Sequence, residues 1–275
     1  MRELRFLLSC FVALLLSFSA YGSTIFNRSQ TTNIPAKSID LGIRVVSSIA
    51  NDGTVTTTAI GRADDASFMA TFPNAKPLYL ATGNLIINNA GSGYIASPTE
   101  MASGSNKDLF GWADITGRKT SMNLNDYPSI YPPAHISGNS AYDIARVKLG
   151  NNWRLPTVDE LVFLIKNAAQ HVTTNEQWSP ASYSYGTHSL WQNSPTGMTI
   201  TSKVVGFEDK SIFLPAVGYR DFGFTTVAHV GIRGYYWSGT RYSTNNSYYL
   251  NFSSDTWSVS YNYRGTGFAV RPVSE

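Results

Sequence analysis

The sequence feature that most restricts the fold is a proline followed directly by helix signals. Pro156 pushes Leu155 out of the α region, so no helix can run through this point. Thr157 then caps a new helix, and Glu160 three residues later completes a capping box. The next apolar residues recur at spacings of three and four, which places them on one face of a predicted helix. They are Val158, Leu161, Val162, Ile165, Ala168 and Ala169.

A shorter helix is predicted just before this proline, from Ala141 to Leu149. It ends at Gly150, because glycine and the two asparagines after it tolerate the left-handed backbone of a helix end. The chain then runs extended into Pro156. Arg154 in this extended piece, and Arg271 near the C-terminus, are expected to support the sheet by pairing with carboxylates.

Strand signals are clearest at the two ends of the chain. Apolar and polar residues alternate over 248–252 and 257–263, with a turn at 253–256, which predicts a hairpin with one buried face. Residues 268–273 are expected to end that sheet. Near the N-terminus, Leu41–Val46 and Val55–Ile60 flank an Asn-Asp-Gly turn and predict a second hairpin.

Four sequence blocks resemble, in order, a family of secreted Bacteroidetes proteins that carry the Fibrobacter succinogenes major paralogous domain. Together they span Pro77 to Val273. The blocks are Ala81–Leu85 with Asp108–Trp112, Tyr142–Ala145 with Trp153–Thr157, Leu214–Arg220, and Gly234–Ser238 with Gly267–Val273.

This resemblance implies a fold related to C-type lectins and to the formylglycine-generating enzyme. We therefore expect an α+β domain with two main helices and many short antiparallel strands, preceded by a short β extension. The predicted organisation is a signal peptide at residues 1–22, an extension with a β-hairpin at 23–65 and a C-type-lectin-like domain at 66–275. Fold alone does not fix function.

The N-terminus predicts export. Arg2 and Arg5 precede the apolar run Phe6–Phe18, and small residues follow at the positions that a signal peptidase reads. An uncleaved anchor and lipidation at Cys10 are the alternatives. Cleavage after Gly22 leaves an exported chain without cysteine, hence without disulfides or cysteine-bound zinc, and with no further transmembrane segment.

Enzyme and nucleic-acid signatures are weak. Basic residues form no run, so nucleic-acid binding has no support. The four histidines have no metal-ligand spacing. Asp159 and Glu160 lie in the first turn of the predicted helix, where carboxylates favour the helix dipole. The related sulfatase-modifying activity depends on cysteine or bound metal and does not carry over. The histidines are His135, His171, His188 and His229.

Calcium-dependent sugar binding also lacks its usual residues. C-type lectins use a Glu-Pro-Asn-like loop and a Trp-Asn-Asp triplet, whereas here Ser238-Gly239 follows Trp237. We therefore expect no cofactor. A structural calcium at Asp108, Asp114 or loop carbonyls stays open.

Aromatic residues near the C-terminus are the remaining candidates for ligand contacts. Aromatic faces beside amide and guanidinium groups can hold sugar rings, and tyrosine and tryptophan are common anchors at protein interfaces. The alternative is that Trp237, with Phe252, Trp257 and Phe268, belongs to the core. The candidate binding residues are Tyr235, Trp237, Arg241, Tyr242 and Tyr261.

The favoured function is a non-enzymatic binding module, exported or on the cell surface, whose ligand is a glycan or a surface protein, as in an adhesin. The alternatives are a hydrolase or other enzyme of the related superfold, and a structural subunit of a surface assembly. An exposed aromatic shelf would favour glycan binding, convergent carboxylates or histidines in one pocket would favour an enzyme, and an unpaired strand edge would favour assembly.

Overall fold

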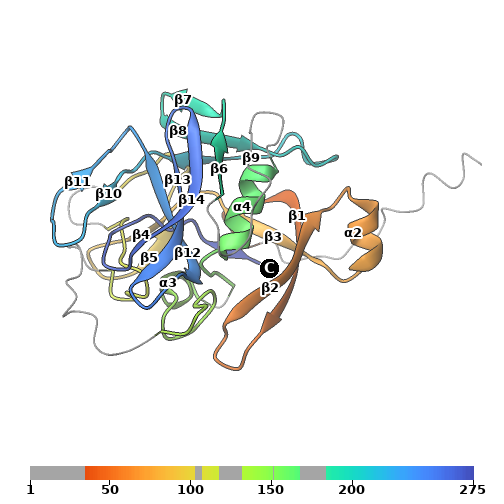
Figure 1. The fold of residues 1–275 in the computed structure, drawn as a ribbon, viewed down its shortest axis with the longest axis horizontal. Coiled ribbons are helices and arrows are strands. Elements are labelled where there is room, and N and C mark those ends of the chain that lie inside the picture. The colour runs from red at the N-terminus through yellow and green to blue at the C-terminus, as the bar shows by residue number, and fades with distance from the viewer. Residues whose placement is uncertain (1–34, 103–106, 118–131, 151, 168–183) are drawn as a thin grey trace, which may run out of the picture. The chain divides into compact units, whose positions relative to one another are not determined.

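The computed structural model describes residues 35–102, 107–117, 132–150, 152–167 and 184–275. The chain divides into two units, residues 1–34 and 35–275, and all described residues belong to the second (Figure 1). The predicted signal peptide, Cys10 and His171 lie outside the described residues. Within these ranges, no helix combines the length and the apolar character that crossing a membrane requires.

The described part of the chain is mainly β, which corrects the expected α+β fold with two main helices. Among the helices of the described residues, only α4 (Val158–Lys166) is longer than six residues; α2 (Ala66–Thr71) and α3 (Ile144–Leu149) have six each. α3 is shorter than predicted because Asp143 is its N-cap, with a side chain that accepts the N–H groups of the first turn. Residues 141 and 142 therefore precede the helix.

The first sheet brings the C-terminus to the N-terminal strands. β1 (Ser38–Ile49) and β2 (Val55–Arg62) form an antiparallel hairpin, and β3 (Lys76–Ala81) pairs with the other side of β1. β15 (Val273–Ser274) then pairs with β3, so the order is β15-β3-β1-β2. The hairpin thus shares a sheet with later strands, across the predicted boundary at residue 65, and β2 lies at the edge.

The second sheet contains the predicted C-terminal hairpin. Its order is β12 (Gly234–Arg241), β13 (Asn246–Phe252), β14 (Thr256–Tyr263) and β6 (Ser184–Thr187), all antiparallel. The predicted alternation is confirmed as far as Val259, because residues 248, 250, 252, 257 and 259 are buried in one core together with the apolar face of α4, whereas Tyr261 and Tyr263 are only partly buried. The expectation that residues 268–273 end this sheet holds in part: Ala269 forms a parallel bridge with Tyr236 on β12, whereas Val273 starts β15 and joins the first sheet.

The opposite face of the second sheet covers a second core. This core contains Tyr235, Trp237 and Phe268, with Tyr249 packed against it. Three smaller sheets complete the described fold. They are β4 (Leu85–Ile87) with β5 (Gly93–Ile95), β7 (Trp191–Asn193) with β8 (Thr196–Thr201) and β9 (Ser211–Pro215), and β10 (Tyr219–Arg220) with β11 (Val227–Ala228).

The predicted start of α4 is confirmed. Thr157 is the N-cap, and its side chain accepts the N–H of Glu160 while the Glu160 carboxylate accepts the N–H of Thr157. The apolar face of the helix, including Leu161 and Ile165, is buried in the core. Each bond of the box satisfies a backbone donor that helix geometry leaves unpaired.

Glu160 has a second role beyond the cap, because its carboxylate is also the partner of a buried arginine. Arg154 Nη1 and Nη2 each lie 2.8 Å from one Glu160 oxygen. Arg154 Nη2 also lies 2.6 Å from Glu275, and Thr57 Oγ1 donates to Glu160. Arg154 therefore pairs with carboxylates as the sequence predicts, and the network joins β2, α4 and the C-terminus.

Among the described residues, Arg271 does not pair with a carboxylate, although the sequence predicted that it would. It is fully buried, and its guanidinium donates to Asn84 Oδ1 at 3.0 Å and to the carbonyls of Ala81 and Phe213 at 3.0 and 2.7 Å, with no carboxylate partner among the described residues. Burial accordingly lowers the pKa of Arg271 to about 10. This arginine supports the fold by binding neutral oxygens of three segments.

Replacing Arg154 by methionine is expected to destabilise the protein by about 3–5 kcal/mol, because the change leaves the Glu160 carboxylate buried without its cation. Chemical denaturation monitored by tryptophan fluorescence measures this difference. The matched control is Arg62→Met, which breaks the more exposed pair with Asp64 and should cost about 1 kcal/mol or less. Equal effects of the two changes would contradict the central role of the buried pair.

Candidate functional site

Two of the five predicted binding residues are buried in the second core. Trp237 has 1 % of its surface exposed, and its Nε1 donates to the carbonyl of Phe110 at 2.7 Å. Tyr235 has 7 % exposed and stacks on Phe268 with 5.2 Å between ring centroids. Because solvent hardly reaches either ring, their burial favours the packing role that the sequence left as the alternative.

The third residue, Arg241, is partly exposed at the end of β12. Its Nη1 donates to the carbonyl of Pro132 at 2.7 Å, and its backbone N–H donates to the carbonyl of Ala134. The guanidinium thus fixes the strand end against the segment at 132–135. It adds positive charge beside His135, whose pKa is lowered by burial and by Arg241.

The structure brings together the remaining two residues, Tyr242 and Tyr261. Their rings stack with centroids 3.7 Å apart and planes 2° from parallel. Tyr248 meets Tyr242 edge-on at 5.4 Å and is the cross-strand neighbour of Tyr261. Tyr242 keeps 43 % of its surface exposed, whereas Tyr248 keeps 8 %. We call these three residues the tyrosine shelf.

The shelf follows from strand register. Side chains of paired residues on antiparallel strands point to the same face, so Tyr248 on β13 and Tyr261 on β14 lie side by side. Tyr242 reaches them because β12 ends at Arg241 and the Tyr242 N–H donates to the carbonyl of Asn246. The shelf therefore continues, towards solvent, the face of the sheet that α4 covers further along.

Asp159 lies near the shelf, and sequence reasoning assigned it only to the helix dipole. Burial, together with the adjacent carboxylate of Glu160, raises the pKa of Asp159 to about 6. Its Oδ1 is buried without a hydrogen-bond partner. Burial raises the pKa of Tyr248, and the charges of Tyr242 and Asp159 add to this shift. The sequence gives no sign of this, because the burial of Glu160 and the partial burial of Asp159 arise from tertiary packing.

A groove with a volume of about 280 Å³ lies between the edge strand β2 and α4. Its walls are mostly apolar, with Asp159 and Lys166 as its charged residues. The other lining residues are Thr57, Thr58, Ala59, Ile60, Val162 and Phe163.

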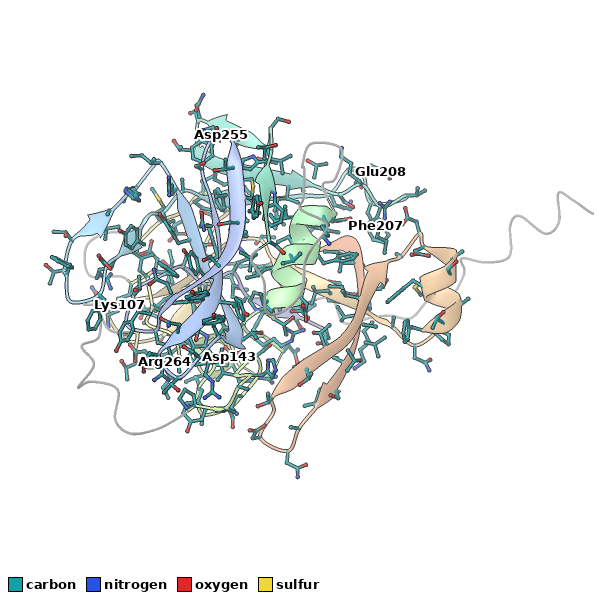
Figure 2. The ribbon with its side chains drawn as sticks, viewed as in Figure 1. Lys107, Asp143, Phe207, Glu208, Asp255 and Arg264 are labelled. Atoms are coloured by element: carbon teal, nitrogen blue, oxygen red, sulfur yellow. The ribbon has the colours of Figure 1, made fainter. Side chains whose placement is uncertain are left out.

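The other acidic candidates are used in local structure. Asp114 Oδ1 accepts the N–H and hydroxyl of Thr116, and an oxygen of Asp108 accepts the N–H of Ala102. Asp143, labelled in Figure 2, accepts backbone N–H groups from both sides of α3, from Gly138 before the helix and from Leu155 after it. Among the residues that the structure describes, no three His, Cys, Asp or Glu side chains gather as metal ligands do.

Comparison with known proteins identifies similarity in the C-terminal part only. Residues 202–273 match a domain of unknown function (DUF8237). No curated protein matches the chain, and no solved structure does. The matched segment includes β9 to β14 and therefore carries all three tyrosines of the shelf, whereas Asp159 and the groove lie outside it.

The raised pKa of Asp159 predicts a pH-dependent stability. An unfolded aspartate has a pKa of about 3.9, so the folded protein binds this proton more tightly than the unfolded chain does. Relative to Asp159→Asn, the wild type should therefore gain stability as the pH is lowered from about 7 to about 4, and lose it again as the pH rises through about 6. Urea denaturation over this range measures the difference.

Asp64 is the matched control for this titration. Its hydrogen-bonded partner Arg62 holds the pKa of Asp64 below its usual value. Relative to Asp64→Asn, the wild type should lose stability as the pH falls through the folded pKa of Asp64, the opposite sign. The same trend for both aspartates would contradict the assignment.

Proposed function

We propose that this chain is a non-enzymatic binding module, exported from the cell, that holds a glycan on the tyrosine shelf. The observation that carries the proposal is the stacked pair of Tyr242 and Tyr261. Tyr242 remains 43 % exposed, although it contacts both Tyr261 and Tyr248. Most large apolar side chains of the described β-sheets are buried, so an exposed and ordered stack of rings favours ligand contact.

The chemistry of the shelf suits a sugar. The apolar face of a pyranose packs on a flat aromatic ring, whose electron-rich face attracts the weakly positive C–H groups. Tyrosine hydroxyls at the rim can donate to and accept from sugar hydroxyls. Tyr242 and Tyr261 are supported from below by Tyr248, which fixes their orientation before any ligand arrives and so lowers the entropy lost on binding.

The same proposal extends to fold family and location. Two features support a C-type-lectin-like fold. The C-terminal strand β15 pairs within the N-terminal sheet, and the described chain contains many short antiparallel strands. The sequence blocks support membership of the Fibrobacter major paralogous family, and residues 1–22 support export to the cell surface, the periplasm or the medium. A metal-dependent hydrolase has less support, since no three His, Cys, Asp or Glu side chains gather as metal ligands do among the described residues.

A glycan array probed with the exported chain, residues 23–275 by prediction, tests this proposal. Saturable binding to a defined sugar is expected, both with calcium and with a chelator, because the calcium-binding residues of lectins are missing from the sequence. Loss of binding in the chelator would instead assign a metal to the site. Absence of binding in both conditions would exclude the glycan proposal for the sugars tested.

Tyr242→Ala should weaken binding of the selected sugar roughly tenfold or more, because truncating a central aromatic contact commonly costs about 1.4 kcal/mol or more. Isothermal titration calorimetry measures the change. Tyr185→Ala, at an exposed tyrosine on the edge strand β6, is the control and should leave the affinity unchanged. Equal affinities for wild type and Tyr242→Ala would place the sugar elsewhere.

A further inference from the structure

The edge strand β2 has backbone groups that no described segment uses. β2 pairs with β1 on one side, and Val55 N–H donates to Ser137. Apart from this pairing with β1, the backbone groups from Thr56 to Gly61 form no hydrogen bond with the backbone of the described residues. In a strand, alternate N–H and C=O groups point to opposite sides, so those on the side away from β1 face outwards, with the alternation interrupted at Thr58, the extra residue of a bulge opposite Val46 and Ser47.

The sequence of β2 leaves this edge open to pairing. Edge strands usually carry lysine, proline or inward-pointing charges, which prevent another strand from adding. Residues 55–61, by contrast, read Val-Thr-Thr-Thr-Ala-Ile-Gly, with no charge and no proline. This composition has a high propensity for β structure and is favourable for strand addition.

The helix on the other side of the groove presents a patterned stripe. Asp159, Val162, Phe163 and Lys166 lie at spacings of three, four and seven residues, and all line the groove. Along the helix axis, Asp159 is about 5 Å from the two apolar residues and about 10 Å from Lys166. Side chains on one face of an added strand recur about every 7 Å. Three such positions span about 14 Å, against about 10 Å along the helix, and the long side chains of Lys166 and of a basic peptide residue can bridge the difference.

Charge also selects the occupant. Asp159 forms no ion pair with any described residue, its Oδ1 has no hydrogen-bond partner, and the neighbouring charge on Glu160 is negative. A basic side chain in the groove would neutralise it. Lys166, at the other end, offers the opposite charge.

We propose that the groove between β2 and α4 binds an extended peptide of a partner protein, which adds to the sheet as a fifth strand beside β2. The peptide carries a basic residue over Asp159, an apolar residue two positions away over Val162 and Phe163, and an acidic residue two positions further over Lys166. Main-chain bonds to β2 supply affinity, and the alternating side chains supply specificity. This site is separate from the tyrosine shelf and does not depend on the glycan proposal.

Selection from a random nine-residue peptide library displayed on phage, with the exported chain as bait, tests this site. The expected result is enrichment of peptides that alternate basic, apolar and acidic residues at every second position. An enriched peptide, made synthetically, should bind at least about tenfold more weakly when its basic residue is replaced by norleucine. With Asp159→Asn protein, the two peptides should bind alike.

Backbone pairing is tested on the peptide, so that the protein stays intact. N-methylation of the alternate amides that face β2 should abolish binding, whereas methylation of the intervening amides should preserve it. Tyr242→Ala protein should bind the peptide as the wild type does, which keeps the result independent of the shelf.

Three outcomes would overturn the proposal. They are a library without any enriched sequence, enriched peptides that tolerate methylation of either set of amides, and binding unaffected by Asp159→Asn. Light scattering measures the oligomeric state and so tests whether a second copy of the chain occupies the groove. A dimer that Ala59→Lys converts to a folded monomer would assign the edge to self-association and would also overturn the peptide proposal.

Discussion

The buried ion pair between Arg154 and Glu160 is the interaction on which the described structure depends. Arg154 has 2 % and Glu160 1 % of its surface exposed, so each charge requires the other. Glu160 also completes the cap of α4 and accepts from Thr57 on β2, while Arg154 reaches Glu275 at the C-terminus. The pair thus ties together the helix start, the edge strand and Glu275. The cost of desolvating the pair is offset by these additional hydrogen bonds.

The position of α4 that results from this pair explains both proposed sites. The helix packs with one face in the core beneath the second sheet, and the adjacent stripe, which shares the buried Val162, lines the groove towards β2. Beyond the start of the helix, the covered face of the sheet runs on as Tyr248, Tyr261 and Tyr242 and becomes exposed. Asp159, at the junction, is covered enough for its pKa to rise to about 6. Small changes in helix position should therefore affect both sites.

Local sequence signals predicted the parts that depend on local physics. The capping box at Thr157, the buried face of α4 from Val158 to Ile165 and the alternation from Tyr248 to Val259 are confirmed, because each is set by residues within a few positions of one another. Ala168 and Ala169 of the predicted face lie outside the described residues. Arg271 was expected to find a carboxylate and instead binds carbonyls, since its neighbours come from β3 and β9.

By itself the sequence determined the start of α4 and the positions of the two hairpins, because caps, prolines and periodicity act through nearest neighbours. It also placed Tyr242 and Tyr261 among the candidates, without showing that they meet. Tertiary structure alone decided that they stack, that Tyr235 and Trp237 are buried, and that β2 is an edge beside α4. These outcomes depend on strand order and on which sheet face receives the helix, and both arise from contacts between residues far apart in the chain.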